Sequence, residues 1–411
     1  MTANRNKIIV LYHYMYPDDV VSARHFDDLC VGLVSRGWAV EAKPCNRGYR
    51  GESRTYSMTD SFKGINISRI WRPPFSQSSS VGRVVNAIWM ISAWSTIILR
   101  RKSSLPRCII VGTEPIFSVL VATIIKFFRP NIVVAHWCFD MYPEAAVAEG
   151  LLPKTSRLNK LFSLILGKAY ESCDLIVDIG ECMRGLFLKY KISTRMVTLV
   201  PWALSEPNAP LATDAVERTK IFGKTDLGLM YSGNFGRAHS CNEILMLARR
   251  LRTHNIRFCF SVRGNRVDEL HASITDNDDN ISFADFAAEE DLEKRLGAAD
   301  IHMVSLQPDW TGAVVPSKFF GCLAAGRPVI FSGSDDSSVA KNIIIHKVGW
   351  VLNENTLDDI CAELILYSAS PSKLRDLQTH CYKVYRENFS KEVMIDGWDL
   401  ELKKTISLEE A

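Results

Sequence analysis

Three short segments in the second half of the chain combine small residues with a basic side chain. They are Tyr231–Arg237, Arg263-Gly264 and Pro316-Ser317-Lys318. Glycine lets backbone N–H groups approach an anion, and arginine or lysine adds a charge-assisted hydrogen bond. Each segment alone is also compatible with an ordinary turn or helix cap. Together they predict a site for a phosphate-bearing ligand.

The first segment reads Tyr-Ser-Gly-Asn-Phe-Gly-Arg and contains neither the dinucleotide pattern GxGxxG nor a P-loop. It lies between a predicted strand, Leu227–Tyr231, and a predicted helix, Asn242–Thr253. Arg263-Gly264 follows the predicted strand Phe258–Val262, and Lys318 opens a predicted helix. Because ligands of open parallel sheets bind at the carboxyl ends of the strands, we expect the three segments to converge.

An acidic segment in the first half follows the predicted strand Ile132–Ala135. It begins at His136 and continues to Asp140-Met141-Tyr142-Pro143-Glu144. Carboxylates at a strand end can orient a substrate hydroxyl, and a histidine beside them can move protons. A lone histidine in this place is also commonly structural. A second acidic patch, Asp276–Asp279, is predicted to be a loop, because no apolar strand leads into it. The alternative is a metal-binding DxD motif.

A long basic stretch also stands out. From Ser61 to Thr113 there are eight Lys or Arg residues and no Asp or Glu. Inside it, the apolar run Val84–Leu99 carries Trp89 and Trp94 and is followed by Arg100-Arg101-Lys102. The run is shorter than the roughly 20 residues that span a bilayer. It predicts a helix that binds in the plane of an anionic membrane, with a buried core helix as the alternative.

Composition limits what can position these residues. The chain has 411 residues, 47% hydrophobic and 23% charged, with a net charge of +3. Single domains seldom exceed about 250–300 residues, so two domains are expected. The small net charge gives no reason to expect a nucleic-acid partner. The 11 cysteines include no CxxC pair and indicate reduced, buried thiols of a cytoplasmic protein. A short apolar run after the polar N-terminus does not indicate a signal peptide.

Apolar strand-like runs alternate with helical patterns in both halves, which is typical of α/β domains with parallel sheets. The Pro-rich, polar segment Ser205–Thr225 separates the halves. We therefore predict domains at residues 1–205 and 206–390, and a final helix at 391–411 that packs back toward the first domain.

These motifs, in this order, resemble the family 4 glycosyltransferases of bacterial exopolysaccharide, O-antigen and colanic-acid synthesis. The resemblance rests on Tyr16-Pro17-Asp18 with Arg24 and Gly37, on Asp140–Glu144, on Gly233–Gly236, and on Val315–Lys318 with Ala325–Pro328. It implies the GT-B fold, two Rossmann-like domains facing each other across a cleft. The first domain would bind the acceptor and the second the nucleotide-sugar donor.

The resemblance assigns roles to the candidate residues. Donor-binding residues would be Gly233, Asn234, Gly236, Arg237, Arg263, Gly264, Ser317 and Lys318. Catalytic residues would be Asp140, Glu144 and His136, and acceptor-side residues Tyr16, Asp19 and Arg24. The implied reaction retains anomeric configuration and needs no cofactor and no essential metal. The donor would be a UDP- or GDP-sugar and the acceptor a lipid-linked saccharide, so the enzyme would work at the inner face of the plasma membrane.

The chain also departs from the family pattern. Ala313 and Gly321 stand where many members carry two glutamates, and Phe139 stands where they carry a histidine. Val20-Val21 replaces a glycine pair. These departures keep open a catalytically silent GT-B protein that serves as a subunit of a polysaccharide assembly complex. A nucleotide-sugar epimerase of the same fold would need its own acid–base residues, and no convincing set is present.

Overall fold

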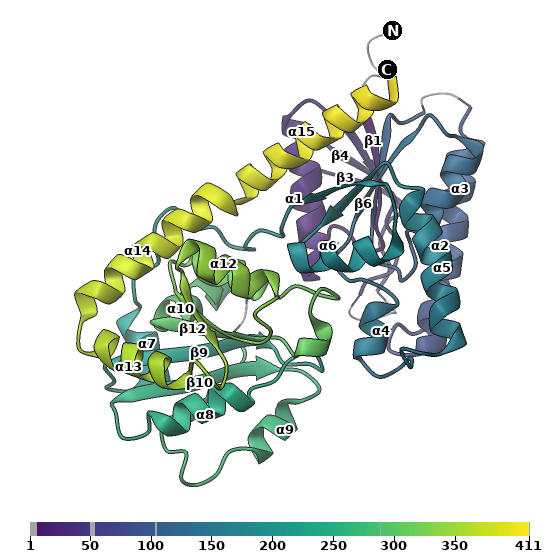
Figure 1. The fold of residues 1–411 in the computed structure, drawn as a ribbon. Coiled ribbons are helices and arrows are strands. Elements are labelled where there is room, and N and C mark those ends of the chain that lie inside the picture. Colours follow the sequence, from purple (N-terminus) through teal and green to yellow (C-terminus); the bar gives the residue numbers. More distant parts are fainter. Residues whose placement is uncertain (1–5, 50–53, 103–104, 288, 411) are drawn as a thin grey trace. The chain divides into compact units, whose positions relative to one another are not determined.

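The computed structural model describes residues 6–49, 54–102, 105–287 and 289–410 (Figure 1). The chain forms two compact units, and each has its own sheet. Unit 1 consists of Met1–Val200 with Glu392–Ala411, and unit 2 of Pro201–Lys391. The sequence placed the boundary a few residues later, at 205 and 206.

The sheet of unit 1 has the strand order β3-β4-β2-β1-β5-β6-β7-β8, and all its neighbours are parallel except β3 and β4. Its strands are β1 (Lys7–Leu11), β2 (Ala39–Ala42), β3 (Thr59–Phe62), β4 (Ile65–Ser68), β5 (Cys108–Gly112), β6 (Val133–Trp137), β7 (Leu175–Asp178) and β8 (Arg195–Thr198). The central strands β1 and β5 are almost entirely apolar and buried, because helices cover both faces of a parallel sheet.

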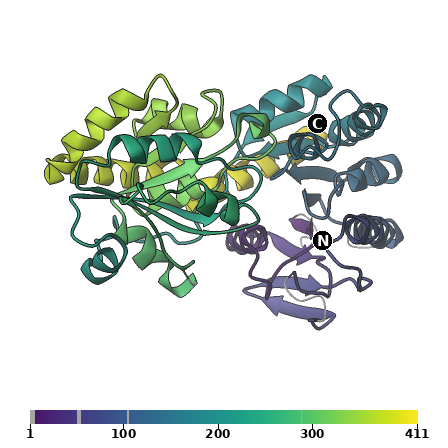
Figure 2. The ribbon, with the colours of Figure 1, turned by 90° about the horizontal axis from the view of Figure 1, so that it is seen from below.

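The helices of unit 1 form two layers. They are α1 (Val21–Ser35), α2 (Ser80–Arg100), α3 (Leu120–Phe128), α4 (Glu144–Ala148), α5 (Arg157–Glu171), α6 (Glu181–Phe187) and α15 (Lys391–Glu410), with a short 3₁₀ turn at Leu188–Tyr190. On one side, α2 packs on α3 and α3 on α5 (Figure 2). Elsewhere in the unit α15 lies against α1, where Arg36 pairs with Asp396 and the Trp38 indole donates to Asp399 at 2.7 Å.

The sheet of unit 2 is parallel throughout, in the order β11-β10-β9-β12-β13-β14. Its strands are β9 (Leu227–Asn234), β10 (Ile256–Arg263), β11 (Ile281–Phe283), β12 (Ile301–Ser305), β13 (Val329–Ser332) and β14 (Gly349–Leu352). Its helices are α7 (Ala215–Phe222), α8 (Asn242–Arg250), α9 (Val267–Ala272), α10 (Leu292–Ala298), α11 (Lys318–Ala324), α12 (Ser338–His346), α13 (Leu357–Ser368) and α14 (Pro371–Asn388), with 3₁₀ turns at Glu289–Asp291 and Pro308–Trp310.

Three strands run further than their apolar runs predicted. β9 continues through Gly233 and Asn234, β10 includes Arg263, and β6 includes His136. The reason is pairing: β9 and β10 stay in register over their full length, from Leu227 opposite Ile256 to Asn234 opposite Arg263. Polar residues can therefore continue a strand when a neighbour satisfies their backbone groups.

Within the described residues, α2 is the helix with the length and apolar character that could cross a membrane, judged by those properties alone. Its buried side includes Met90, Trp94 and Ile98. The Trp94 indole is fully buried and donates to the Lys43 carbonyl at 2.7 Å. Trp94 thus belongs to the core of unit 1, whereas Trp89 is 43% exposed.

Candidate functional site

Two glycines shape the carboxyl ends of β9 and β10 in unit 2. Gly233 has φ 122° and Gly264 has φ 139°, which disfavours a side chain at either position. A Cβ on Gly264 would lie 2.4 Å from the Phe235 carbonyl oxygen. A Cβ on Gly233 would lie 2.8 Å from Cε of Lys318. The backbone therefore needs glycine at both positions, and Gly233 leaves the space that Lys318 fills.

Lys318 is the first residue of α11, and its ammonium points to the end of β9. The Nζ atom donates to the Asn234 carbonyl at 2.6 Å and lies 4.4 Å from the centre of the Tyr231 ring. Desolvation lowers the pKa of Lys318 to about 7. Within hydrogen-bonding reach it faces a carbonyl and the Tyr231 hydroxyl, with no carboxylate among the contacts that the described residues make to it. Below about pH 7 its positive charge is therefore available to an anionic ligand.

The remaining donor residues gather around this lysine. Arg263 is exposed, and its guanidinium stacks on the Phe286 ring at 4.1 Å. The Phe235 N–H donates to the Arg263 carbonyl at 2.7 Å, which ties the ends of β9 and β10 together. Gly236 follows this link, beside the side chain of Asn234. The structure thus brings together Lys318, Asn234, Gly233, Gly264 and the backbone of Arg263.

Two further donor candidates lie beside this cluster. Ser317 caps α11 without a side-chain cap hydrogen bond, so its hydroxyl is not used for capping. Arg237 is exposed on the segment between β9 and α8. The helix α8 begins at Asn242, as predicted, and ends at Arg250, three residues before the predicted end.

A cavity of about 540 Å³ in unit 2 was not foreseen from the sequence. It is lined from the ends of β12, β13 and β14 and the start of α8, and its polar residues include Ser240, Asn242, Glu243, Arg266, Gln307, Ser332, Ser334, Asn353 and Glu354. None of the predicted donor residues lines it. Arg266 joins it to the loop after β9 by donating to the His239 carbonyl at 2.6 Å. The run Ser332-Gly333-Ser334 after an apolar strand was the signal that could have pointed to it.

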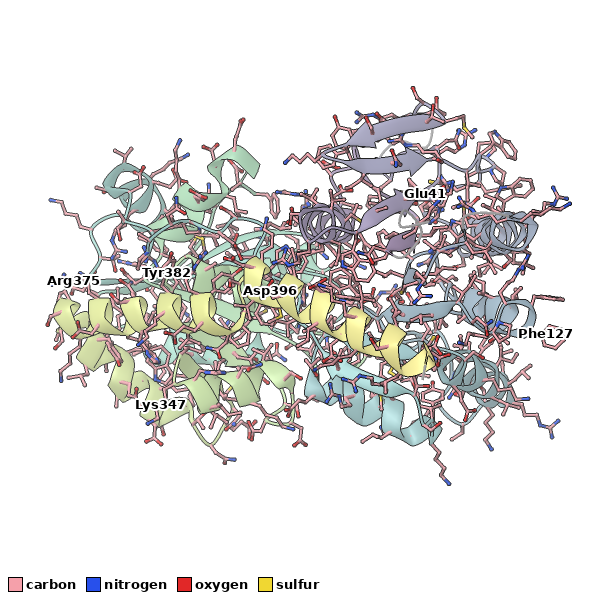
Figure 3. All side chains as sticks on the ribbon, turned by 90° about the horizontal axis from the view of Figure 1, so that it is seen from above. Glu41, Phe127, Lys347, Arg375, Tyr382 and Asp396 are labelled. Carbon is pink, nitrogen blue, oxygen red and sulfur yellow. The ribbon has the colours of Figure 1, made fainter. Side chains whose placement is uncertain are left out.

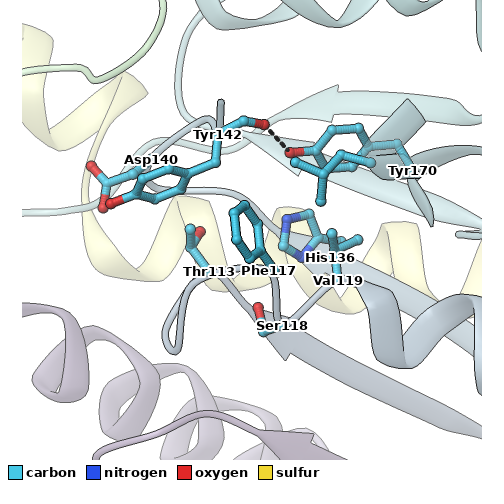
Figure 4. Close-up of a pocket in the computed structure, with 9 residues that line it drawn as sticks. Thr113, Phe117, Ser118, Val119, His136, Asp140, Tyr142 and Tyr170 are labelled. Atoms are coloured by element: carbon cyan, nitrogen blue, oxygen red, sulfur yellow. Dashed lines mark hydrogen bonds between the residues drawn. The ribbon is translucent and has the colours of Figure 1, made fainter. Parts of the chain in front are cut away.

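In unit 1, Asp140 and His136 line a cavity of about 10 Å³ together with Thr113, Tyr142 and Tyr170 (Figure 4). The Tyr170 hydroxyl donates to the Tyr142 carbonyl at 3.2 Å. Asp140 is exposed at one end of this group. Desolvation by the surrounding protein, and then the charge of Glu114, raise the pKa of Asp140 to about 6.

His136 is less suited to chemistry than its neighbour. It lies inside β6 rather than after it, is 2% exposed, and its Nδ1 lies 3.0 Å from the Val111 carbonyl. Burial lowers the pKa of His136 to about 4, so the ring is neutral at physiological pH. These observations favour a structural role for the histidine.

Glu144 also has a partner within unit 1. It is the first residue of α4, and its Oε1 accepts the Tyr190 hydroxyl at 2.7 Å. Burial raises the pKa of Glu144. It does not line the small cavity. The structure therefore distinguishes two carboxylates that the sequence treated alike. Asp140 is exposed to a ligand, whereas Glu144 accepts a hydrogen bond from Tyr190.

The acceptor-side candidates surround the end of β1. Tyr16 is 38% exposed and stacks on Phe62 with ring centres 4.1 Å apart. Asp19 is exposed in the same loop, and Arg24 lies in the first turns of α1 with its charge acting on Asp27. Tyr16 and Asp19 are thus accessible, whereas Arg24 is partly buried.

Comparison with known proteins adds to this geometry. No family model matches the chain. A probable glycosyltransferase, WbjE of Pseudomonas aeruginosa, is 24% identical over 267 residues, which are 62% of this chain and 66% of that protein, just under two thirds. Sucrose-phosphate synthase from Thermosynechococcus elongatus superimposes with a TM-score of 0.72 at 12% identity, covering 98% of this chain and all of that one. The chain has the GT-B fold.

Two further GT-B structures are similar over nearly the whole chain. Anabaena HepE, solved with UDP, gives a TM-score of 0.65 at 10% identity, covering 97% of this chain and 100% of its own. The lipopolysaccharide outer-core galactosyltransferase WaaB gives 0.62 at 10%, covering 99% and 100%. The resemblance predicted from the motifs is confirmed, and the comparisons support a sugar transferase.

Within this GT-B chain, the positions of the missing glutamates differ from each other. Ala313 is buried at 1%, whereas a Cβ on Gly321 would meet nothing within 4 Å. Phe139, in place of the family histidine, packs among aromatic rings that include Trp137 at 4.6 Å. The acidic patch does not gather ligands either: Arg249 pairs with Asp278 and lowers its pKa. No group of three or more potential metal ligands occurs among the residues that the structure describes.

Proposed function

We propose that the protein is a glycosyltransferase that moves a sugar from a UDP- or GDP-sugar to a hydroxyl of a lipid-linked saccharide in cell-surface polysaccharide synthesis. The observation that carries the proposal is the cluster at the ends of β9 and β10, where Lys318, two obligatory glycines and Arg263 converge. The relatives support it: HepE was solved with UDP, and WaaB is named for lipopolysaccharide synthesis.

The geometry matches the demands of this reaction. The bond between the sugar C1 and the diphosphate breaks while the acceptor oxygen bonds to C1, so negative charge grows on the leaving diphosphate. Lys318 and backbone N–H groups near Gly233 would stabilise that charge in place of a metal ion. The acceptor hydroxyl would give its proton to the departing diphosphate as the new bond forms. Asp140 would orient that hydroxyl, and we propose retention of configuration, as in the family that the sequence resembles.

Calorimetric titration with a panel of UDP- and GDP-sugars tests the proposal. We expect one nucleotide class to bind and Lys318→Ala to weaken it strongly, with Lys383→Ala as the control, since Lys383 lies exposed on α14 and pairs with Glu387. Turnover should not change when a chelator is added. A folded protein that binds no member of the panel would contradict the proposal and favour the silent subunit.

We further propose that unit 1 binds the anionic inner face of the plasma membrane, where a lipid-linked acceptor resides. The contact differs from the one that the sequence indicated. Trp94 is buried and Arg101 pairs with Glu41 at 2.6 Å, so neither is free for lipid. The exposed apolar residues of α2 lie in its first half and include Val81, Ile88 and Trp89.

The neighbouring helices continue this surface. On α5 the exposed apolar residues are Leu158, Leu161, Leu164 and Ile165. The exposed basic residues there are Lys154, Arg157, Lys160 and Lys168, and no Asp or Glu occurs from Leu151 to Tyr170. Phe127, at the end of α3, points outward with 79% of its surface exposed (Figure 3). Apolar side chains flanked by positive charge fit the interface of an anionic bilayer.

Co-sedimentation with phosphatidylcholine vesicles, with and without phosphatidylglycerol, checks the membrane contact. Binding should require the anionic lipid, weaken with salt, and fall when Leu161 and Leu164 become Ser. The pair Ile344→Ser and Ile345→Ser is the matched control, because these residues are equally apolar and exposed in unit 2. Equal loss in both pairs, or no loss on α5, would place the contact elsewhere.

A further inference from the structure

Arg72 is the most unusual charged residue of unit 1. It is fully buried, and its Nε, Nη1 and Nη2 atoms have no hydrogen-bond partner within the described part of the chain. No described carboxylate forms an ion pair with it. A buried charge without a partner is strongly destabilising. In the sequence, Arg72 is only one of eight basic residues in a stretch without Asp or Glu.

The backbone around this arginine is held rigidly. The Arg72 N–H donates to Oδ1 of Asn46 at 2.9 Å, and the Arg72 carbonyl accepts Nε of Arg47 at 2.7 Å. Hydrogen bonds thus fix the backbone that carries the guanidinium, although the guanidinium's own donors are unused. Arg47 also adds a second cation beside the same backbone.

Other unsatisfied polar groups surround Arg72. The Tyr14 hydroxyl is buried and has no partner among the described residues. The His13 ring stacks on the Tyr14 ring with centres 4.3 Å apart, and its Nδ1 lies 3.5 Å from Oε1 of Glu114. Burial disfavours the cation of His13, but Cys45 and Glu114 outweigh this and raise its pKa. The group therefore has unused donors on Tyr14 and Arg72, and His13 is a second cation that Cys45 and Glu114 stabilise.

Electrostatic coupling shows that these side chains act on one another. Burial raises the pKa of the Cys45 thiol, but the charges of His13 and Arg72 more than offset this and lower it. The pKa of Tyr14 is raised by burial, Cys45 and Glu114, and the charge of Arg72 opposes the rise. The charge of Arg72 thus acts on both Tyr14 and Cys45.

The topology places this group where α/β sheets bind ligands. His13 and Tyr14 follow β1, Cys45 follows β2, Arg72 follows β4 and Glu114 follows β5. The strand order β4-β2-β1-β5 makes these strands neighbours, and they are parallel. Backbone hydrogen bonds continue the sheet at this edge, with Cys45 N donating to His13 O at 2.9 Å and His13 N to Glu114 O at 3.1 Å.

We infer that Arg72, Tyr14 and His13 form a binding site for a phosphate group, and that this group belongs to the acceptor. The second half of the inference rests on the proposed function. A guanidinium, a phenol and an imidazole together offer more donors than a carboxylate can accept, whereas phosphate suits such a set. Tyr49, 47% exposed, packs edge-on against Tyr14 with ring centres 5.3 Å apart.

Stability measurements without ligand provide the first test. Arg72→Met removes an unpartnered buried charge, so it should raise the melting temperature. The matched control is Arg69→Met. Arg69 is also buried, at 5%, but donates to the Ser57 and Tyr16 carbonyls and pairs with Asp60. Its loss should lower the melting temperature. If both variants lose stability, Arg72 is a structural residue and the inference is wrong.

Ligand binding provides the second test. Inorganic pyrophosphate and farnesyl diphosphate are titrated into a Lys318→Ala background, which removes the donor cluster as a competing site. Both probes should raise the melting temperature, and Arg72→Met should weaken their binding at least tenfold. Tyr14→Phe, which changes little in the fold, should weaken it severalfold. Protection that is the same with and without Arg72 would overturn the site.

The two probes also separate the sources of the phosphate. Tighter binding of farnesyl diphosphate than of pyrophosphate supports a lipid-linked acceptor, whereas equal binding overturns the acceptor assignment and leaves a phosphate site. In a protein with Lys318 intact, Arg72→Met should still bind the UDP- or GDP-sugar. If the protein binds no UDP- or GDP-sugar but still binds pyrophosphate through Arg72, the proposed transferase function is wrong and the phosphate site stands.

Discussion

Two arginines, one in each unit, are equally buried and differ in every contact of their guanidinium groups. Arg327 in unit 2 is 1% exposed and donates to the carbonyls of Ala299, Leu211 and Gly297 at 2.7–2.9 Å. Arg72 in unit 1 is fully buried and donates to none in the described chain. The donors of Arg327 are used within the fold, whereas those of Arg72 find no acceptor in the described chain.

The same difference extends to the strand ends around them. In unit 2, Lys318 already donates to the main-chain carbonyl of Asn234, so the donor cluster is organised before a ligand arrives. In unit 1, the hydroxyl of Tyr14 and the guanidinium of Arg72 are unused. A preorganised site loses little on binding, while an unsatisfied one loses stability until it is filled.

The largest expected effect comes from Arg327→Met. The buried carbonyls of Ala299, Leu211 and Gly297 would lose their donor at once. Each buried acceptor left unsatisfied costs about 1–3 kcal/mol, so we expect a large loss in the free energy of unfolding. Urea denaturation of this variant beside Arg72→Met measures the contrast directly. A small loss for Arg327→Met would erase the distinction between the two arginines.

Lys318→Ala should follow in size. Removing a charge that stabilises a leaving diphosphate is expected to cost about 10²–10³ in turnover, or roughly 2.7–4 kcal/mol. Steady-state rates with the donor identified by calorimetry give this value, with Lys383→Ala as the control. A folded Lys318→Ala enzyme with normal rates and normal donor affinity would remove the lysine from the site.

Asp140→Asn is expected to lower transfer by about a hundredfold while donor affinity stays unchanged, because the carboxylate would act on the acceptor. Glu144→Gln is the comparison: it weakens the contact with Tyr190 and should reduce stability more than rate. Parallel loss of donor affinity in Asp140→Asn would move this residue to the donor side.

The donor cluster should also show a pH dependence. Lys318 has a pKa of about 7 in the folded protein against 10.5 for the free side chain, so it is cationic below pH 7 and loses its charge above it. Donor affinity should be constant below pH 7 and fall by up to about tenfold per pH unit above it. Calorimetry from pH 6 to 9 checks this, and an identical profile for Lys318→Met would contradict it.

The same shift affects stability with a defined sign. Between about pH 7 and 10.5 the unfolded chain binds the Lys318 proton and the folded chain does not, so this residue makes the fold more stable as pH rises through that window. Lys318→Met should lack this contribution. A slope of opposite sign would mean that the lysine is charged in the folded state.

Much of the fold followed from the sequence because its signals are local. Apolar runs predicted the positions of β6, β9 and β10, since buried parallel strands must be apolar on both faces. The hairpin of β3 and β4 was missed, because Thr59–Phe62 is polar and exposed and its turn uses Lys63 and Gly64 with positive φ. No repeating apolar pattern in the sequence indicates that this segment pairs with β4.

Part of the site followed as well. Gly233 and Gly264 could be chosen from the sequence because they are small residues at the ends of predicted strands. Lys318 could be chosen because it opens a predicted helix. The choice between Asp140 and Glu144 could not be made, since it depends on Tyr190, which lies 46 positions further along the chain and donates to Glu144. The cavity beside Arg266 was invisible for the same reason, because four separate strand and helix ends line it.

By itself, then, the sequence determined the two α/β halves, the glycine and lysine signature at the strand ends and the likeness to sugar transferases. Only the tertiary structure decided which charged side chains already have hydrogen-bond partners. Arg327 belonged to a recognised motif and is used by carbonyls of its own fold, whereas Arg72 belonged to no motif and is left without a partner. Residue type and neighbours in the chain set what a side chain can donate, but distant segments set whether its donors are already taken.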